Sequence, residues 1–527
     1  MSLKKEAVAG ADVDERLAAL MTNSNAIRAI ASAVEGTLGP KGLDTMLVDQ
    51  FGEVVITNDG VTILTMMEAS HPAARMLINI ARAQQEEIGD GTTTATVLAG
   101  ALVGAGVEQV ARGVPVARVI EGLRIGLKKA LQIMHERARP VTDLEDRAIR
   151  QVALIAGRGH EDIGDLVIQA AVMIGKDKLR DNTFKFPDTV VAEEGADNKV
   201  FMGVIVNKER ISRQVPAELE DLGVLIIDDA LEPEEIDEEA LGTEAGFAHY
   251  MQLREEFNVN LQKIVALNVG LVLVDRGISD DAEDILTDAG IMAVQRVANK
   301  ELRRAAEHTG ARILKRKGLK KSLPELKRCL GHAARVYHDE QLEQVWILGG
   351  GGKPMATVLV GAATAEVVGE RERIARDAAA AIQSAIKDGV VPGGGSLELA
   401  VALELEKVRA GARGMAAYGV DCVVEALKRP LSQIVANAGF NPLEKLGDVI
   451  AAQAETGKSS LAVDCENGQV ADMLASGIMD PAGVKIYALK AAGEVAEAIL
   501  RIDTIIKKRE EREIEREIRT REEGKMF

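Results

Sequence analysis

The stretch EIGDGTTTATVLAG, residues 87–100, predicts a buried helix preceded by a turn that binds a ligand. Glycines let the backbone approach a ligand closely, and the first N–H groups of a helix attract anions. Thr92, Thr93 and Thr94 add hydroxyl groups at the same end. Asp90 would repel a phosphate unless a divalent cation lay between them, because Mg²⁺ binds one or two carboxylates together with phosphate oxygens. The stretch therefore predicts a phosphate cradle with a metal at Asp90; the alternative is an ordinary capped helix.

This cradle is not a Walker A loop, since the chain contains no GxxxxGK[ST] string. The rest of the composition limits the classes of protein to consider. A chain of 527 residues with 47% hydrophobic residues can bury several cores, so more than one domain is expected. The net charge of −18 argues against nucleic acid or an anionic membrane as a partner, because both favour basic surfaces.

The cysteines and the N-terminal sequence favour a reducing cytoplasm. Cys329, Cys422 and Cys465 are far apart and form no CxxC pair, so neither a disulfide framework nor a structural zinc site is expected. The first twenty residues carry acids and lysines where a signal peptide would be continuously apolar. The longest apolar run, TTTATVLAGALVGAGVEQVA, is rich in glycine and threonine and is interpreted as a buried helix.

The pattern of hydrophobic residues changes twice along the chain. Up to about residue 138, long aliphatic helices surround MLVDQFGEVVIT, which predicts a β-hairpin. From about 199 to 356, short β-rich runs such as LGVLIIDD and VGLVLVD alternate with helical segments. After about 390 the helical pattern returns. The expected fold class is therefore multi-domain α+β, in which a mostly helical domain is interrupted by an inserted α/β domain.

Three further motifs carry a family resemblance: GTLGPKGLDTMLVD (36–49), TNDGVTIL (57–64) and DGVVPGGGSLELA (388–400). Together with GDGTTT, and in this order and spacing, they resemble the chaperonins over essentially the whole chain. The resemblance implies an equatorial ATPase domain in two parts, a small intermediate domain in two parts, and an apical domain that holds the substrate. The expected boundaries are 1–138 and 391–527 for the equatorial domain, 139–198 and 357–390 for the intermediate domain, and 199–356 for the apical domain.

The segment FAHYMQLREEFNVNLQKIVALN (247–268) resembles part of the helical protrusion, about 229–268, that forms a built-in lid in archaeal and eukaryotic cytosolic chaperonins. A separate lid protein would then be unnecessary. Phe247, Tyr250, Leu253 and Phe257 recur at helical spacing and are expected to lie on one face. Such a stripe is more often core than contact surface, but on a projecting arm contact with neighbouring arms or unfolded clients is expected.

The same resemblance assigns the nucleotide site. It implies that ATP and Mg²⁺ are the cofactors and that Asp90 is the metal ligand. The remaining matched positions are the loop that packs against the nucleotide (Thr37, Leu38, Gly39, Pro40), the phosphate contacts (Gly91, Thr92, Thr93, Thr94), and the sites near the base and ribose (Gly394, Asp480).

Hydrolysis needs a carboxylate that orients or deprotonates the attacking water. Two acids match this role in the family, Asp59 and Asp377. From the residues alone, Asp59 is equally an Asp-Gly turn, and Asp377 is equally part of a solvated helix face beside Arg373 and Arg376. An acid carried by the intermediate domain would reach the nucleotide only when that domain swings down, which would couple hydrolysis to closure.

Two regions depart from the family pattern. In AGRGHED (156–162), Arg158 stands where relatives with built-in lids carry a lysine in a loop that senses the terminal phosphate. Arginine also binds phosphate, but with a different geometry. The C-terminal IIKKREEREIEREIRTREEGKMF lacks the Gly- and Met-rich tail of many relatives and predicts a solvated helix. These departures are typical of a divergent branch such as the group III chaperonins of some bacteria.

The predicted function is that of an ATP-dependent chaperone, a homo-oligomer of two stacked rings of eight subunits that encloses unfolded polypeptides. The hairpin in 46–57 resembles the stem loop that joins neighbouring subunits. Two alternatives stay open. A phosphotransferase with Asp59 or Asp377 as base would be a monomer or dimer, and a scaffold or holdase would bind nucleotide without hydrolysing it.

Overall fold

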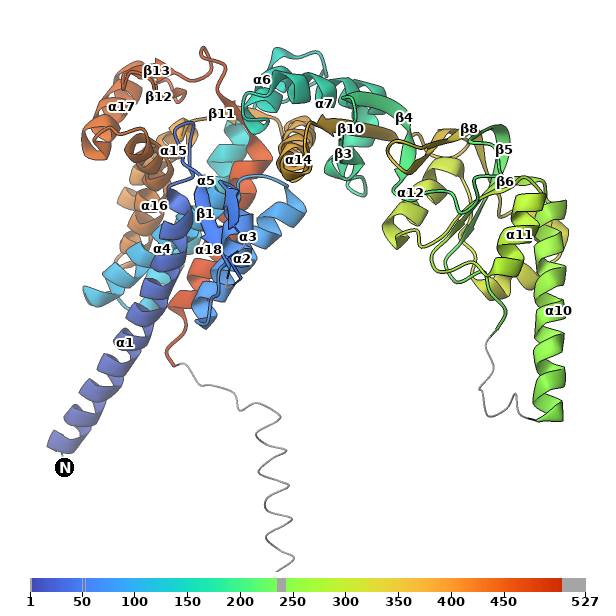
Figure 1. Ribbon diagram of the computed structural model, residues 1–527. Coiled ribbons are helices and arrows are strands. Elements are labelled where there is room, and N and C mark those ends of the chain that lie inside the picture. The colour runs from blue at the N-terminus through green and yellow to red at the C-terminus, as the bar shows by residue number, and fades with distance from the viewer. Residues whose placement is uncertain (1, 50, 53, 235–242, 505–527) are drawn as a thin grey trace, which may run out of the picture. The chain divides into compact units, whose positions relative to one another are not determined.

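The computed structural model describes residues 2–49, 51–52, 54–234 and 243–504. The chain forms two compact units, one made of Met1–Val141 together with Lys387–Phe527 and the other of Thr142–Ile386. The chain therefore leaves the first unit and returns to it, as the change of sequence pattern predicts. Helical and β-rich segments are both present, so the predicted α+β class is confirmed (Figure 1).

The first unit is a bundle of long helices. Its central helix, α4 (Thr92–Ala111), packs against α1 (Ser2–Glu35), α3 (Pro72–Glu87), α16 (Ala416–Asn437) and α18 (Ala482–Leu500). The helices α5 (Val116–Arg137), α15 (Ser396–Gly411) and α17 (Pro442–Thr456) complete the bundle. Helix α4 is long and apolar enough to span a membrane, but its apolar residues, such as Leu98 and Leu102, belong to the core of this unit.

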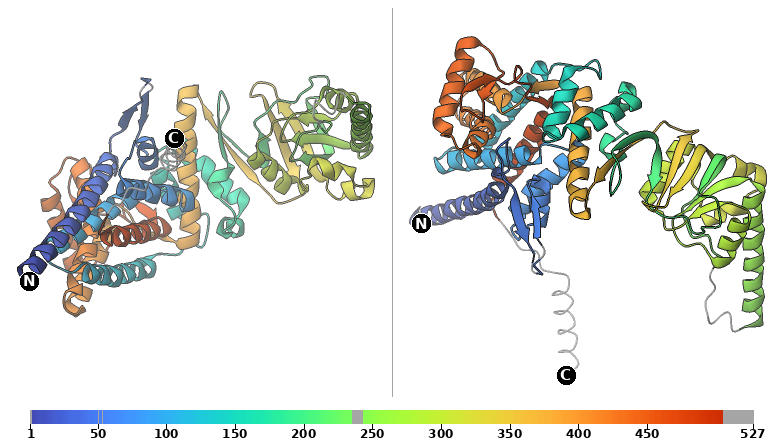
Figure 2. Two further views of the ribbon diagram at one scale, coloured as in Figure 1. Left: turned by 90° about the horizontal axis from the view of Figure 1, so that it is seen from below. Right: turned by 45° about the horizontal axis from the view of Figure 1, so that its top comes forward.

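In the described part of the first unit, three small antiparallel sheets accompany the helices. The predicted hairpin is present as β1 (Thr45–Val48) and β2 (Val54–Thr57), and it projects from the helices (Figure 2). Strand β11 (Val390–Pro392) pairs with β14 (Met479–Pro481), and β12 (Leu461–Val463) pairs with β13 (Val470–Asp472). The β11–β14 pair brings together two segments that are far apart in the sequence.

The second unit is built around a mixed sheet with the strand order β3-β10-β4-β9-β8-β5-β6-β7. The strands are β3 (Val190–Glu194), β4 (Lys199–Val206), β5 (Glu218–Ile227), β6 (Val269–Val274), β7 (Met292–Val294), β8 (Gly331–Asp339), β9 (Gln344–Gly350) and β10 (Ala356–Ala362). Its larger helices are α6 (Arg147–Ala156), α7 (Glu161–Ile174), α10 (Glu244–Ala266), α11 (Asp280–Asp288), α12 (Asn299–Thr309) and α14 (Ala365–Asp388).

Alternate residues of the central strands face two separate cores. On β5, Val224 and Ile226 join one hydrophobic cluster with α12, while Leu225 and Ile227 join another with α10 and α11. This is the two-residue period expected of a strand that is covered on both faces. Strands β3 and β10 extend the sheet beyond residues 199–356, so the finer division of this unit into intermediate and apical domains stays a prediction.

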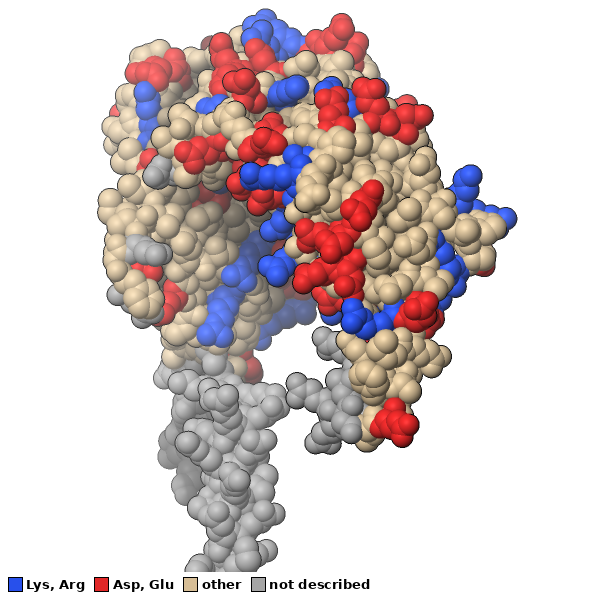
Figure 3. All heavy atoms as spheres, turned by 45° about the vertical axis from the view of Figure 1, so that its right-hand side comes forward, with Lys and Arg blue, Asp and Glu red and all other residues tan. Residues whose placement is uncertain are grey.

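Charged side chains of both signs lie on the surface. On the face drawn in Figure 3, both acidic and basic side chains are visible, and several of the acidic ones lie together in one patch. The three cysteines are free: Cys329 and Cys422 are buried and Cys465 is half-buried. The predicted C-terminal helix lies outside the described residues.

Candidate functional site

The start of α4 has the features of an anion site. Gly91 is the N-cap of the helix, with a φ of 81°, and offers no side chain to the first N–H groups. A Cβ atom at Gly91 would lie 2.5 Å from Cγ1 of Val484, so only glycine fits this turn. The Asp90 carboxylate accepts a hydrogen bond from the Gly91 N–H at 2.5 Å. The turn therefore presents a carboxylate beside open helix N–H groups, which suits a phosphate with a cation.

The loop after α1 lies against this helix start. The Thr37 hydroxyl oxygen is 3.5 Å from that of Thr93. Asn437, on α16, holds the loop by donating hydrogen bonds to the carbonyl oxygens of Glu35 and Leu38, each at 2.8 Å. Gly39 follows with a φ of 89° and packs on Ile434, also on α16. The first predicted nucleotide loop, Thr37 to Pro40, is thus fixed by α16 beside the turn at Gly91.

The TNDG turn approaches the same point from a third direction. Asp59 is the N-cap of α2 (Gly60–Met66), and its Oδ2 accepts hydrogen bonds from the N–H and the hydroxyl of Thr62 at 2.9 and 2.6 Å. A Cβ atom at Gly60 would lie 2.5 Å from the Thr93 hydroxyl oxygen. Three segments that are separate in the sequence therefore meet at Thr93.

A second cluster of glycines forms the end of the site that is expected to hold the nucleoside. Val391 on β11 pairs with Asp480 on β14, which places Asp480 beside the turn Gly393–Gly395. Gly395 has a φ of 77°, and a Cβ atom there would lie 2.8 Å from backbone atoms of Leu431 on α16. The turn that carries the predicted residue Gly394 thus lies beside Asp480, which approaches it at Gly393, and it packs against the same helix that holds Thr37 to Pro40.

The other two predicted residues, Arg158 and Asp377, belong to the second unit. On α14, Arg373 pairs with Asp377 at 2.7 Å and with Glu370 at 2.5 Å. Arg158 lies 3.6 Å from Glu370 and has a φ of 54°, which is unusual for a residue with a side chain. These four residues form a continuous chain of ion pairs along one face of α14, so Asp377 is linked to the loop of Arg158 through alternating charges.

The aromatic stripe of α10 divides into two halves. Phe247 is 57% exposed and contacts the ring of Tyr250, while Leu253 is half-buried. Phe257 is only 6% exposed and packs with Leu261 and Ile264 in the core under the sheet. The expectation that Phe257 belongs to a contact surface is wrong, because this half of the helix lies on the sheet. Only the N-terminal half of α10 stands clear of the core.

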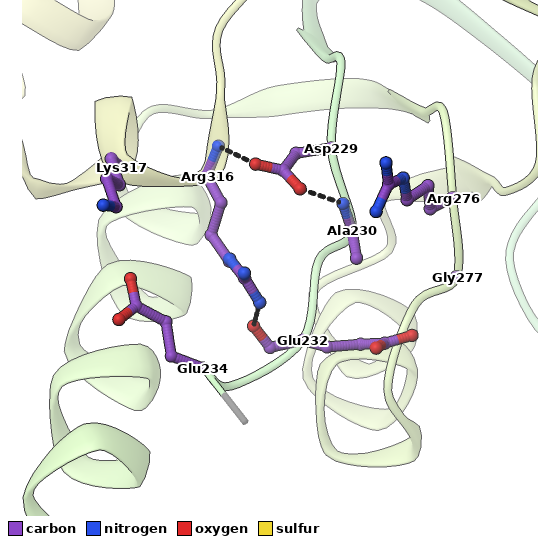
Figure 4. A pocket seen from close by; sticks show the side chains of 8 residues that line it. All are labelled: Asp229, Ala230, Glu232, Glu234, Arg276, Gly277, Arg316 and Lys317. Atoms are coloured by element: carbon purple, nitrogen blue, oxygen red, sulfur yellow. Dashed lines mark hydrogen bonds between the residues drawn. The ribbon is translucent and has the colours of Figure 1, made fainter. Parts of the chain in front are cut away.

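A hollow of about 460 Å³ lies at the root of this arm. Figure 4 shows the Asp229 carboxylate between the backbone N–H groups of Ala230 and Arg316, and the Arg316 guanidinium on the carbonyl oxygen of Glu232. Burial favours the neutral carboxyl, but these N–H groups and the nearby positive charges outweigh it and lower the pKa of Asp229. The arm therefore leaves the sheet from a segment tied down by hydrogen bonds.

The side chains near Asp90 can hold Mg²⁺ only if a bound ligand supplies further oxygen atoms to the metal. Among the residues that the structure describes, no group of three or more His, Cys, Asp or Glu side chains is arranged to hold a metal ion. A cation at Asp90 would then take its remaining oxygen ligands from phosphate and water, as Mg²⁺ commonly does. The open N–H groups at the start of α4 suit those phosphate oxygens.

Three buried residues that support the site were missed by the sequence analysis. Gln84 is fully buried and donates hydrogen bonds to the carbonyl oxygens of Asp90 and Val484, at 2.7 and 3.2 Å. Lys485 is paired with Glu398 and Asp480. Gln84 also bonds to Val484 across 400 residues, and Lys485 and Glu398 are 87 residues apart, so local patterns carry no sign of these two contacts. A lysine five residues after Asp480 on an otherwise apolar helix start was the one available signal.

The comparisons with known proteins identify the family of this chain. The sequence model of the TCP-1/cpn60 chaperonin family matches residues 30–510. A thermosome subunit of Pyrococcus abyssi is 34% identical over 503 residues, covering 92% of this chain and 90% of the relative. A thermosome subunit beta of Thermococcus kodakarensis is 36% identical over 502 residues, covering 92% and 91%.

A solved structure indicates to which group of chaperonins this chain is similar. The crystal structure of a group III chaperonin in the open state superposes with a TM-score of 0.85 at 48% identity, covering 94% of this chain and all of that one. The predicted resemblance to lid-carrying chaperonins and their divergent branch is thereby confirmed. This chain belongs to the TCP-1/cpn60 chaperonin family, and it is a subunit of an ATP-dependent double-ring chaperone.

Proposed function

We propose that ATP binds in the first unit along the line from the start of α4 to the Gly393–Gly395 turn. The observation that carries this assignment is the convergence of the Thr37, Gly60 and Thr93 segments at the open end of α4. The phosphates would lie on the N–H groups of Thr92 to Thr94, and the nucleoside would lie beside Gly394 and Asp480. Asp90 would hold Mg²⁺, which supplies positive charge to the phosphates when it is bound.

Two acids are proposed to serve the attacking water. Asp59 lies within the converging segments, and its Oδ2 is oriented by Thr62, so its carboxylate is fixed in place. Asp377 is oriented instead by Arg373 on the second unit. We infer that Asp377 meets the nucleotide when the second unit closes, and that Arg158 responds to the terminal phosphate. Hydrolysis would then occur only in the closed subunit.

The hairpin β1–β2 supports the assembly of rings. Its strands and turn expose large apolar side chains, namely Met46, Val48, Phe51, Val54 and Ile56. A two-stranded ribbon with unpaired edges and exposed apolar residues is suited to receive a strand from a neighbouring subunit. We propose two stacked rings of eight identical subunits joined in this way.

The arm of the second unit supports a built-in lid. Phe247 and Met251 on the N-terminal half of α10 are 57% and 50% exposed, on a helix whose other half is anchored in the core. Such a surface is suited to neighbouring arms and to unfolded polypeptide. We infer that no separate lid protein, nucleic acid or membrane is a partner, and that the chaperone works in the cytoplasm.

Particle mass and hydrolysis test these proposals together. Light scattering of the purified protein should give a particle close to a megadalton, since each chain is 56.2 kDa. Asp377→Ala should keep that mass and lose ATP hydrolysis. A monomer or dimer would favour the phosphotransferase, and normal hydrolysis in the variant would remove Asp377 from the mechanism. A wild-type particle that binds ATP without hydrolysing it would favour the scaffold.

A further inference from the structure

A buried lysine lies directly beneath the proposed nucleotide site. Lys485 is in the first turn of α18 and is 7% exposed. Its Nζ is 2.6 Å from Oε1 of Glu398 and 2.8 Å from Oδ2 of Asp480. Burial alone would lower the pKa of Lys485, but the two carboxylates outweigh it and raise the pKa, so the side chain is charged. Lys485 is thus an ammonium group held between two acids.

Burying the charged groups of Lys485 and Glu398 removes them from water, so a contribution to stability alone does not explain why they are buried. Glu398 is 1% exposed, so its charge depends on Lys485 for compensation. Buried ion pairs can often be replaced by apolar residues without loss of stability, because removing charges from water offsets much of their attraction. A buried pair that also fixes a group at the edge of a ligand site has a second reason to be retained.

The lysine reaches that edge through Asp480. The Asp480 side chain is 27% exposed, so one of its carboxylate oxygens is held by Lys485 while the group stays open to a ligand. Asp480 is fixed further by the pairing of β14 with β11 and by its approach to Gly393. Lys485 itself is too deeply buried to contact a nucleotide.

The same turn of α18 also supports the phosphate end of the site. Val484, the residue before Lys485, fills the space beside Gly91, and its carbonyl oxygen accepts a hydrogen bond from Gln84. Gln84 also binds the carbonyl oxygen of Asp90. One turn of helix is therefore in contact with both ends of the proposed nucleotide site.

We propose that Lys485 is a positioning residue that orients the Asp480 carboxylate toward the ribose hydroxyls of ATP. A carboxylate fixed by one oxygen accepts hydrogen bonds from a vicinal diol in a defined geometry, and it discriminates against a sugar that lacks one hydroxyl. The inference rests on the proposed nucleotide site and adds the group that sets its preference for ribonucleotides.

The test is the double variant Lys485→Met/Glu398→Gln, which removes the charges of Lys485 and of the buried Glu398 and leaves only the partly exposed Asp480 without its lysine. We expect the KM for ATP to rise about tenfold with kcat within about twofold, because an oriented hydrogen bond to a charged group is lost on binding. The preference for ATP over 2′-deoxyATP should fall toward one. Lys490→Met, an exposed lysine on the same helix, is the matched control and should match the wild type.

A purely structural role gives a different pattern. It would lower the unfolding temperature and change the rates with ATP and 2′-deoxyATP equally, which would overturn the proposal. If the double variant does not form rings, Lys485→Gln replaces it, because it removes the charge beside Asp480 while keeping a polar side chain of similar length. Unchanged KM and unchanged sugar preference in that variant would also overturn the proposal.

Asp480→Asn separates this inference from the proposed site. If Asp480→Asn leaves the KM and the sugar preference unchanged, the placement of the nucleoside at Asp480 is wrong and the inference falls with it. If Asp480→Asn changes both while the Lys485 variants change neither, the site stands and only the role of Lys485 is overturned.

Discussion

The proposed nucleotide loops of the first unit and helix α14 of the second position their predicted site residues by opposite means. In the first unit the backbone does so, because Gly91 and Gly395 lie at positive φ against Val484 and Leu431 with no room for a Cβ atom. On α14, Asp377 is oriented by the ion pair with Arg373. A backbone turn has one arrangement, whereas an ion pair can exchange partners. The comparison indicates a fixed cradle in one unit and an adjustable acid in the other.

The sharpest test of this contrast compares the two acids. Asp59→Asn keeps a residue that caps helices well, and Asp377→Asn keeps the size of the side chain. If both carboxylates act on the attacking water, each variant should lose hydrolysis by about 10²- to 10⁴-fold while binding ATP normally. Steady-state hydrolysis and equilibrium binding of ATP measure the two effects. An Asp59 variant that hydrolyses normally would reduce Asp59 to the cap of α2.

Substitutions in the two halves of α10 should give the next largest effect, on the free energy of unfolding. Phe257→Ala should lower the free energy of unfolding by about 3–5 kcal/mol, because it leaves a cavity beneath the sheet. Phe247→Ala should change it by less than about 0.5 kcal/mol, because the side chain is 57% exposed, but it should weaken capture of a chemically unfolded client. Urea unfolding and prevention of client aggregation are the measurements. Equal effects on stability would contradict the division of the helix.

If the backbone of the proposed nucleotide loops is fixed, adding one methyl group at Gly395 should strongly lower the free energy of unfolding. Gly395→Ala should lower stability by about 3 kcal/mol, since it combines positive φ with a clash against the backbone of Leu431. Gly369→Ala is the matched control, because Gly369 is in α14 with nothing within 4 Å of a Cβ atom. The control should raise stability by up to about 1 kcal/mol. Thermal unfolding with and without ATP would show whether the loss is in the cradle.

The second unit also carries two buried histidines that make it sensitive to acid. Burial lowers the pKa of His308, whose Nε2 accepts a hydrogen bond from Gly350, and burial with Arg210 lowers the pKa of His338. Their contribution to stability is present above the unfolded pKa of about 6.5 and is lost as the pH falls through the lower folded-state pKa.

Fluorescence can follow this loss selectively. Trp346, the single tryptophan of the chain, stacks on Phe201 within the second unit at a centroid distance of 4.4 Å. Its urea unfolding midpoint should fall between pH 7.5 and pH 5, and His338→Phe should reduce that fall. His332→Gln, at an exposed position, should leave it unchanged. A midpoint independent of pH would show that the histidines are protonated without cost.

Much of this architecture could be predicted from local sequence patterns. The runs that predict strands in 199–356 are present as β4, β5, β6 and β7, and the hairpin of 46–57 is present as β1 and β2. The glycines of GDGTTT and PGGGS predicted turns at these positions, because few residues other than glycine adopt a positive φ. Asp377 was predicted as a site residue only from the family resemblance. The hydrophobic pattern of α14 alone would assign it to an exposed face.

The remaining features depend on contacts that no local pattern encodes. Phe257 has the same spacing as Phe247, but the sheet covers it and leaves Phe247 exposed. The ion pair of Lys485 with Glu398 joins positions 87 residues apart in the sequence, and the hydrogen bond from Gln84 to the carbonyl oxygen of Val484 joins positions 400 residues apart. Such partners are set by the packing of α15, α3 and α18, which the sequence specifies only through the whole fold.

The return of the chain to its first unit sets an order of events during synthesis. All the strands of the second unit precede residue 387, so they can pair while the ribosome is still translating the rest. The proposed nucleotide site instead requires Asp480 and the first turn of α18, which are translated after the whole of the second unit. A nascent subunit therefore cannot complete this proposed site before its second unit has been translated in full.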